Sequence, residues 1–198
     1  MSVHSIGRSL SSIVVSRTGK DIENGDSVAV SGYTETSVKM LQIILAAWNI
    51  RAKLEIFPGM YGWDLLDKAP FALLIGDEAL RARMTDLDIT LDIGEAWCKI
   101  TSSPAVFAVS AVNKSTLIEN RGKVRKGSDL LKKALRFRWK IIHELVAEAS
   151  WKYSLPHDLL SEYFQRIRLD FNRSVKRGLR EFMKRTQWLN DIEAHGLQ

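Results

Sequence analysis

The chain is poor in several features that define familiar protein classes. It has one cysteine, Cys98, so an internal disulfide is excluded, and this thiol within "EAWCKI" is interpreted as a packed side chain rather than a nucleophile. No apolar run reaches the roughly 18 residues that a membrane-spanning helix needs. The opening "MSVHSIGRSLSSIVVSR" lacks the apolar block and the cleavage site of a signal peptide. These absences predict a cytoplasmic protein.

Most sequence signatures of cofactor and nucleophile chemistry are missing as well. The chain has no phosphate-binding P-loop, no GxGxxG turn after a strand and no GxSxG elbow. Its histidines have no metal-ligand spacing among themselves; they are His4, His143, His157 and His195. The sequence therefore predicts no metal site, and each histidine is interpreted as a surface or hydrogen-bonded residue.

What the chain does have is ample apolar content and an uneven charge. The 198 residues are 45% hydrophobic, which is enough to bury a core. Residues 121–185 carry 18 Lys and Arg against 7 Asp and Glu, whereas residues 1–120 carry 11 against 14. The basic segment 174–189 is also rich in apolar residues, so it is interpreted as a packed helix with a solvated basic face. We therefore expect neither nucleic acid nor a membrane as a partner.

The hydrophobic periodicity divides the chain near residue 113. Before it, helical patterns such as "TETSVKMLQIILAAWNI" alternate with short β-rich runs, which predicts an α/β fold with a largely parallel sheet. After it the pattern is helical: Asn120–Gly127 is the predicted boundary, Ser128 the predicted N-cap of the next helix, and a further helix is expected to open after Pro156. The predicted strands are Ser12–Ser16, Ser27–Val30, Leu54–Phe57, Phe71–Ile75 and a longer run from Pro104.

Polar residues follow two of the predicted strands. In "SGYTETSVKML", Thr36 and Ser37 stand at the start of a helix, where free backbone N–H groups attract carboxylates, and Thr34 is the expected N-cap. "FALLIGDEAL" places Asp77 and Glu78 directly after a buried strand. Asp77 is interpreted as the cap of the next helix, with a role in a cleft as the alternative.

Four stretches in order resemble one family, the chorismate dehydratases of the futalosine route to menaquinone. "SIGRSLSSIVVS" is similar to that family's serine-glycine crossover segment, and "SGYTETSVKML" to its Ser-Arg-Thr-Ser helix start. "FALLIGDEAL" resembles its Leu-Ile-Gly-Asp segment, and "LDIGEAWCKITSSPAVFAV" its Asp-Leu-Gly-Glu-x-Trp helix and following strand. A fifth stretch near the end, "YFQRIRLDF", is similar to its Arg-Ile-Arg-Tyr-Asp helix. The resemblance covers nearly the whole chain.

This resemblance implies both a fold and an activity. The fold would be that of type II periplasmic binding proteins, with an α/β lobe and crossover segment in residues 1–112 and a helical C-terminal section in residues 113–198 that returns to the first lobe. The activity would be that of a carbon–oxygen lyase that converts chorismate to 3-[(1-carboxyvinyl)oxy]benzoate without cofactor or metal. Two alternatives stay open: the sister enzyme that makes a dihydroxynaphthoate, and a non-catalytic module that binds an aromatic carboxylate.

The resemblance also suggests where the substrate binds. Ser5 and Ser11 near the crossover are the expected substrate-binding hydroxyls of that segment, and Thr36 and Ser37 would hold a carboxylate at the helix start. Asp77 would stand at the rim of the cleft. No general base is evident in the sequence, so a carboxylate of the substrate itself and a base from a segment in front of Met1 remain equal alternatives.

Two departures from the family qualify this expectation. Ser110 stands where many members have Trp, and the family's proteins carry a further first-lobe segment in front of the point that matches Met1. Either activity needs that segment, supplied by a misassigned start or a split gene, or the chain is a shortened relative that no longer catalyses. An incomplete lobe would expose the apolar faces of its C-terminal helices, so we expect a partner that supplies the missing lobe segment, or self-association.

Overall fold

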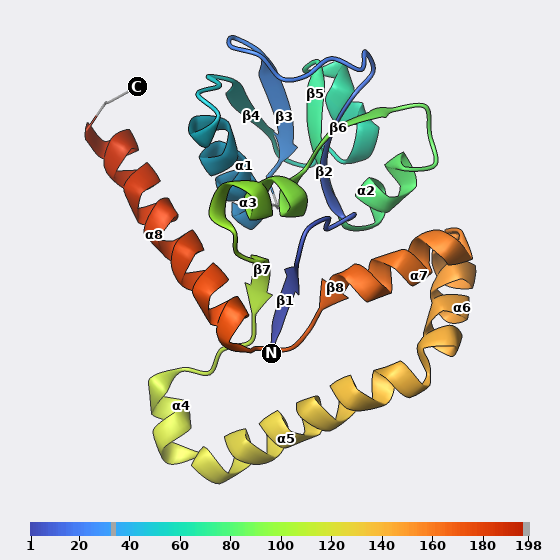
Figure 1. Cartoon of the computed structure of the whole chain (residues 1–198), viewed down its shortest axis with the longest axis vertical. Helices are drawn as coiled ribbons and strands as arrows, with labels where there is room; N and C mark the ends of the chain where they lie inside the picture. The colour runs from blue at the N-terminus through green and yellow to red at the C-terminus, as the bar shows by residue number, and fades with distance from the viewer. Residues whose placement is uncertain (33–34, 196–198) are drawn as a thin grey trace.

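The chain forms a five-stranded sheet and a three-stranded sheet, joined by two crossing segments and flanked by helices (Figure 1). The computed structural model describes the backbone of residues 1–32 and 35–195, and side chains within residues 1–32 and 35–187. The crossing segments are residues 6–11 and residues 102–104. Around the larger sheet the elements are β2 (Ser12–Ser16), β3 (Ser27–Ser31), α1 (Glu35–Ala47), β4 (Lys53–Phe57), the short 3-10 helix η1 (Gly62–Asp67), β5 (Phe71–Ile75), α2 (Gly76–Ala82), β6 (Asp88–Asp92) and α3 (Ile93–Thr101).

The larger sheet is mixed, so the expectation of a largely parallel sheet is wrong. Its strand order is β4-β3-β5-β2-β6, in which β3 pairs in parallel with β4 and β5. Strand β2 is antiparallel to both of its neighbours, β5 and β6. The reason is connectivity: β2 arrives from the smaller sheet, and the loop after it leads into β3 at the same edge of the sheet, so β2 runs against β3 and against β5, which is parallel to β3. We call this sheet and its helices the five-stranded lobe.

Apolar layers cover both faces of the five-stranded sheet. One layer packs Leu41 and Ile44 of α1 and Trp97 of α3 against the strands, and the other packs η1 and α2 against the opposite face. The periodicity of "TETSVKMLQIILAAWNI" predicts one apolar face made of Val38, Leu41, Ile44, Leu45 and Trp48, and this stripe is confirmed at its centre. Trp48 departs from it, because α1 ends at Ala47 and the indole is 41% exposed.

The smaller sheet has the order β7-β1-β8 and is antiparallel throughout. It consists of β1 (Ser2–Ser5), β7 (Ala105–Val109) and β8 (Ile167–Arg168). Strands β1, β6 and β8 have no counterpart among the predicted strands, because they are short or polar and lack a run of apolar residues. Strand β7 is shorter than the predicted run from Pro104.

The helical C-terminal section is present, but its first boundary differs from the prediction. Helix α5 already begins at Arg121, so Asn120–Gly127 is not a linker and Ser128 is an interior residue rather than an N-cap. Lys and Arg are good helix formers, and they extend the helix through this glycine-containing stretch. The elements are α4 (Lys114–Glu119), α5 (Arg121–Phe137), the 3-10 turn η2 (Arg138–Lys140), α6 (Ile142–Tyr153), α7 (His157–Arg166), which opens after Pro156 as predicted, and α8 (Arg173–His195).

These helices differ in how well they pack. A separate apolar cluster joins Val146 of α6 and Leu160 of α7 to Leu10 and Leu80 of the five-stranded lobe. Helix α8 packs on the other side, where Phe182 meets Trp97 with ring centroids 5.9 Å apart. Helices α4 and α5 contain no buried residue. The expected exposure of apolar side chains on the C-terminal helices is confirmed for these two.

Candidate functional site

A cavity of about 360 Å³ lies between the two sheets, and we call it the interlobe cavity. It is bounded by the start of β2, the start of α1, the end of β5, strands β1, β7 and β8, and helix α7. Its lining residues are Val3, Ser11, Ser12, Glu35, Thr36, Ser37, Ile75, Phe107, Tyr163 and Ile167. Three of the sequence-predicted binding residues, Ser11, Thr36 and Ser37, are therefore brought together.

The hydroxyl side of the cavity follows from the strand order. Because β2 runs against β5, its first residue Ser12 pairs with Ile75, the last residue of β5. The Gly76 N–H donates to the Ser11 carbonyl oxygen at 2.8 Å, which joins the crossing segment to the start of α2. The Ser12 hydroxyl donates to the Ser37 hydroxyl oxygen at 3.0 Å, and both side chains are buried. Ser12 thus holds Ser37 at the first turn of α1, beside Thr36.

Tyr163 of α7 closes the cavity from the opposite side. Its phenol and the Ser11 hydroxyl line the same cavity, close enough for Ser11 to affect the pKa of Tyr163, so the helical section meets the crossing segment here. Burial raises the pKa of Tyr163, the Ser11 contact opposes that shift, and the nearby negative charge of Asp77 adds to it. The phenol therefore stays protonated and can donate a hydrogen bond.

Asp77 lies near this phenol but does not cap α2. The N-cap position is Ile75, which makes no side-chain cap hydrogen bond, and Asp77 is an exposed residue of the first turn. The capping interpretation is therefore wrong, because the helix begins one residue earlier, at Gly76, whose φ of +59° suits glycine. The rim position stays a prediction. Thr34, the expected cap of α1, lies outside the described residues.

Ser5 occupies a different environment from the other predicted residues. Its side chain is fully buried and its hydroxyl donates to the Gly7 carbonyl oxygen at 3.2 Å. A Cβ placed on Gly94 would stand 2.5 Å from the Ser5 hydroxyl oxygen and 2.7 Å from the Gly7 carbonyl oxygen. Ser5 is thus packed between the crossing segment and α3 and does not line the interlobe cavity; its role in binding stays a prediction.

Asp92 fixes the crossing segment that carries Ser11. As the N-cap of α3, its Oδ1 accepts hydrogen bonds from the Glu95 N–H at 3.1 Å and the Ser9 N–H at 2.8 Å. Its Oδ2 accepts from the Leu10 N–H at 2.9 Å and from Arg83 Nη2 at 3.2 Å. Burial lowers the pKa of Arg83, and the charge of Asp92 opposes that shift. One carboxylate therefore binds the crossing segment to α2 and α3.

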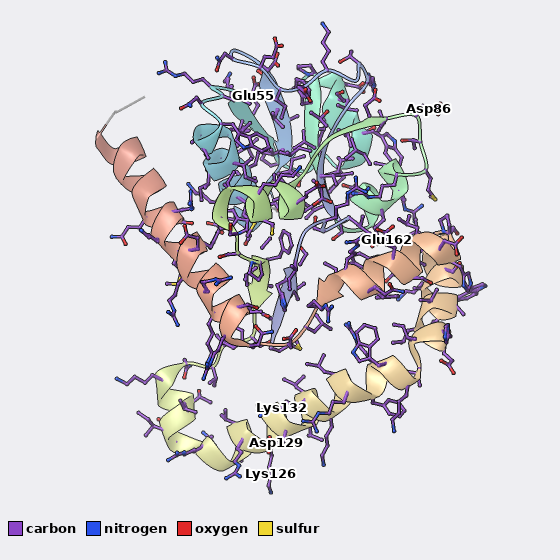
Figure 2. All side chains as sticks on the ribbon, viewed as in Figure 1. Glu55, Asp86, Lys126, Asp129, Lys132 and Glu162 are labelled. Atoms are coloured by element: carbon purple, nitrogen blue, oxygen red, sulfur yellow. The ribbon has the colours of Figure 1, made fainter. Side chains whose placement is uncertain are left out.

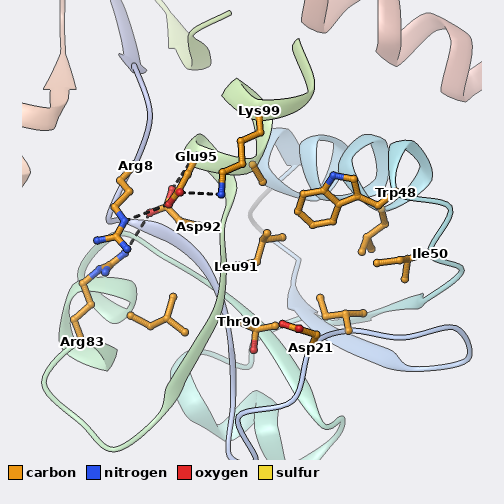
Figure 3. Close-up of a pocket in the computed structure, with 14 residues that line it drawn as sticks. Arg8, Asp21, Trp48, Ile50, Arg83, Thr90, Leu91, Asp92, Glu95 and Lys99 are labelled. Carbon is orange, nitrogen blue, oxygen red and sulfur yellow. Dashed lines mark hydrogen bonds and ion pairs between the residues drawn. The ribbon is translucent and has the colours of Figure 1, made fainter. Parts of the chain in front are cut away.

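A second cavity, of about 490 Å³, lies on the outer side of β6, α1 and α3 (Figure 3). It is larger, but its cationic groups are already paired: Glu95 contacts Arg8 at 3.2 Å and Lys99 at 2.9 Å, and Arg83 is bound to Asp92. The contacts from Lys99 and Arg8 lower the pKa of Glu95. In the interlobe cavity the Thr36 hydroxyl has no hydrogen-bond partner among the described residues, and elements from both sheets converge there, so this cavity is the better candidate site.

Comparison with known proteins agrees with this architecture. A family model described as menaquinone biosynthesis matches residues 1–187. The chain belongs to this family. Two solved structures share its fold: protein AF1704 from Archaeoglobus fulgidus, with a TM-score of 0.66 and 18% identity, and the periplasmic aliphatic sulphonate binding protein SsuA from Escherichia coli, with a TM-score of 0.64 and 9% identity. The similarity covers 98% of this chain and 71% of AF1704, and 97% of this chain and 65% of SsuA.

These findings support the predicted fold and the pathway. The fold is that of the periplasmic binding proteins, followed by a helical C-terminal section, and the family acts in menaquinone biosynthesis. Within residues 1–32 and 35–187, no group of three or more His, Cys, Asp or Glu side chains could hold a metal ion. No helix of the described part of the chain is long and apolar enough to cross a membrane.

Several lining residues had no signal of their own in the sequence. Tyr163 lies in "YFQRIRLDF", a stretch whose similarity to the family was clear, but its helical pattern gave no reason to single out the phenol. Phe107 and Glu35 lie in stretches that resemble the family, but neither was singled out as a candidate residue. All three line the cavity because β7, α1 and α7 converge there.

Proposed function

We propose that this protein is a chorismate dehydratase-like lyase whose substrate binds in the interlobe cavity. The observation that carries the proposal is the convergence of Ser11, Thr36, Ser37 and Tyr163 on one cavity in a chain of the menaquinone biosynthesis family. A cavity of about 360 Å³ suits a ligand with one ring, such as chorismate. SsuA, which shares the fold, is named as a binding protein for aliphatic sulphonates, which are also organic anions.

The reaction makes modest demands on the protein. Chorismate loses its ring hydroxyl and a neighbouring ring proton as water, and the ring becomes aromatic, giving 3-[(1-carboxyvinyl)oxy]benzoate. Aromatisation supplies much of the driving force, so the protein has to bind a dianion, orient the leaving hydroxyl and exclude water. Thr36 and the N–H groups at the start of α1 bind one carboxylate, Tyr163 donates a hydrogen bond from α7, and Phe107 with Ile75 forms an apolar wall.

Turnover is tested directly by incubating the purified chain with chorismate. Liquid chromatography with mass spectrometry follows the appearance of 3-[(1-carboxyvinyl)oxy]benzoate and the loss of one water per molecule. Formation of this product above a heat-treated control supports the proposal. Binding of chorismate without product would leave two alternatives, a module that only binds and an enzyme that needs the further first-lobe segment. Neither binding nor turnover would place the function elsewhere.

Thr36→Val tests the carboxylate site. Replacing the hydroxyl by a methyl group removes one hydrogen bond to a charged group, so chorismate binding should weaken by about 1–3 kcal/mol. Isothermal titration calorimetry measures the change. Thr18→Val is the matched control, because Thr18 lies exposed in the loop after β2. Equal affinity of the two variants would place the carboxylate away from α1.

Glu35→Gln distinguishes catalysis from binding alone. Glu35 is the carboxylate among the described lining residues, so it is the side chain there that could accept the ring proton. If it is the base, the variant should lose about 10²–10⁴-fold in kcat and bind chorismate at least as tightly. Unchanged kcat would leave the substrate's own carboxylate as the proton acceptor. Absence of turnover in both proteins would support a module that binds aromatic carboxylates.

A further inference from the structure

Helix α5 makes few contacts with the rest of the chain, so most of its surface is exposed to solvent. Figure 1 shows it on the far side of the three-stranded sheet from the five-stranded lobe, and none of its 17 residues is buried. One side of the helix faces the chain: Ser128, Leu131 and Leu135 line a cavity of about 280 Å³ with Met1 and Phe171. The expectation of no membrane partner assumed that the basic helices are packed, and α5 is not.

The opposite side of α5 carries a defined pattern of basic and apolar residues. Lys126, Leu130, Lys133 and Phe137 follow one another at intervals of four, three and four residues, which places them on one helix face. Leu130 is 66% exposed and Phe137 is 55% exposed. Helical periodicity puts Leu130 about half a turn away from the side that lines the cavity. We call these four residues the outer face of α5.

The charge around the outer face is predominantly positive. Residues 121–140 contain nine Lys or Arg and one acid, Asp129. Figure 2 shows charged side chains, including Lys126, Asp129 and Lys132, along the helix. Trp139 follows the helix, stays 46% exposed, and stacks under the Arg138 guanidinium at 4.4 Å from the ring centroid. Trp139 lines a cavity with Ile6 and Glu162, so it faces the chain and is not part of the outer face.

We propose that the outer face of α5 binds the surface of an anionic lipid bilayer. A helix with a strongly basic polar side and exposed Leu and Phe side chains lies in the plane of the bilayer interface. Leu130 and Phe137 enter the boundary between headgroups and acyl chains, while Lys126 and Lys133 contact the lipid phosphates. A second copy of this chain fits less well, because two faces of the same positive charge repel each other. Nucleic acid accounts for the lysines but not for the apolar residues between them.

The test uses the whole chain and two kinds of vesicle. Co-sedimentation compares vesicles of phosphatidylcholine alone with vesicles that also contain phosphatidylglycerol, at low and at high salt. The partition coefficient should be at least about tenfold higher on the anionic vesicles, because each basic residue near the surface contributes on the order of fivefold. It should fall as salt screens the charges. Equal partition onto both vesicles contradicts the proposal.

Two pairs of variants test the outer face itself. Leu130→Ser with Phe137→Ser should lower the partition coefficient about fivefold or more, whereas Ile56→Ser with Met183→Ser should leave it unchanged. The control residues are each 62% exposed and lie outside α5. Lys126→Glu with Lys133→Glu should also lower it, more than Lys176→Glu with Lys184→Glu on α8, which changes the net charge equally. Far-UV circular dichroism confirms that each variant is folded.

Other occupants of this surface give different results. A second copy would give a dimer in sedimentation velocity, dissociated by the Leu130 and Phe137 substitutions, with no vesicle binding. A nucleic-acid site would bind polyuridylate with an affinity that these serine substitutions leave intact. Either result, or a control pair that lowers vesicle binding as much as the outer-face pair, overturns the proposal.

Discussion

His4 shows how burial sets the properties of a single side chain. It lies in the central strand of the smaller sheet with 1% of its side chain exposed, and its Nδ1 is 3.0 Å from the Ser2 hydroxyl. Its Nε2 is 3.6 Å from a carboxylate oxygen of Asp170. Burial lowers the pKa of His4 from its ordinary value of 6.5; the charge of Asp170 opposes this shift, and the charge of Arg168 adds to it. The fold therefore favours the neutral imidazole.

The lowered pKa of His4 predicts that the folded chain loses stability in weak acid. Because the pKa of His4 is lower in the folded chain, the unfolded chain binds more protons as the pH falls through 6.5 towards the folded value. The contribution of His4 is complete above pH 6.5 and decreases below it. The His4→Asn variant should show a weaker dependence of Tm on pH over this range, measured by thermal unfolding against the exposed control His143→Asn. Parallel curves for wild type and His4→Asn would contradict the assignment.

At the scale of elements, α3 and the crossing segment are fitted to each other. Asp92 begins α3 and binds the N–H groups of Ser9 and Leu10. Leu10 has a φ of +64°, a left-handed conformation that leucine rarely adopts, and these contacts hold it there. Ser11, the last residue of this segment, lines the interlobe cavity. The position of the hydroxyl thus depends on contacts made outside the cavity.

Gly94→Ala should disturb this fit. The added Cβ would stand 2.5 Å from the Ser5 hydroxyl oxygen, 2.7 Å from the Gly7 carbonyl oxygen and 2.9 Å from Ser9 Cβ. Relief of such overlap costs about 1–3 kcal/mol of the free energy of unfolding. Gly127→Ala is the control, because its Cβ would meet nothing within 4 Å and the position is helical. It should stabilise the chain by up to about 1 kcal/mol. Urea denaturation measures both changes, and equal effects would contradict the prediction.

At the scale of the whole molecule, stability is distributed unevenly. The five-stranded lobe has apolar layers on both faces of its sheet, and α6 and α7 are joined to it by their own cluster. Helices α4 and α5 have no buried residue. Segments with few buried contacts open at a low free-energy cost, so α4 and α5 should open before the sheets do.

Limited proteolysis with trypsin measures this difference. Residues 121–140 contain nine cleavable Lys or Arg residues, so the first cuts should fall there while the five-stranded lobe stays intact. Mass spectrometry of the early fragments identifies the sites. Arg17, Arg51 and Lys53, which lie in or beside the strands of the larger sheet, provide the internal control. Early cleavage at these three residues would show that the larger sheet is the less stable part.

The sequence by itself determined the local structure wherever a pattern repeats over many residues. The apolar run Phe71–Ile75 became β5, the 3.6-residue periodicity of residues 35–47 became α1, and the residues after Pro156 became α7. The polar helix start singled out Thr36 and Ser37, and the family resemblance added Ser11; the three residues line one cavity, and their role in binding stays a prediction. The similarity of four stretches to one family pointed to the fold and the pathway that the family model and the solved structures support.

Only the tertiary structure decided which distant segments of the chain lie side by side. The direction of β2 depends on its arrival from the smaller sheet, and the pairing of β1 with β8 joins residues more than 160 positions apart. Tyr163 became a cavity residue only because α7 packs beside the crossing segment, and Ser5 became a packed residue because Gly94 lets that segment approach α3. Such contacts depend on which surfaces meet, and a single sequence carries no local pattern for that.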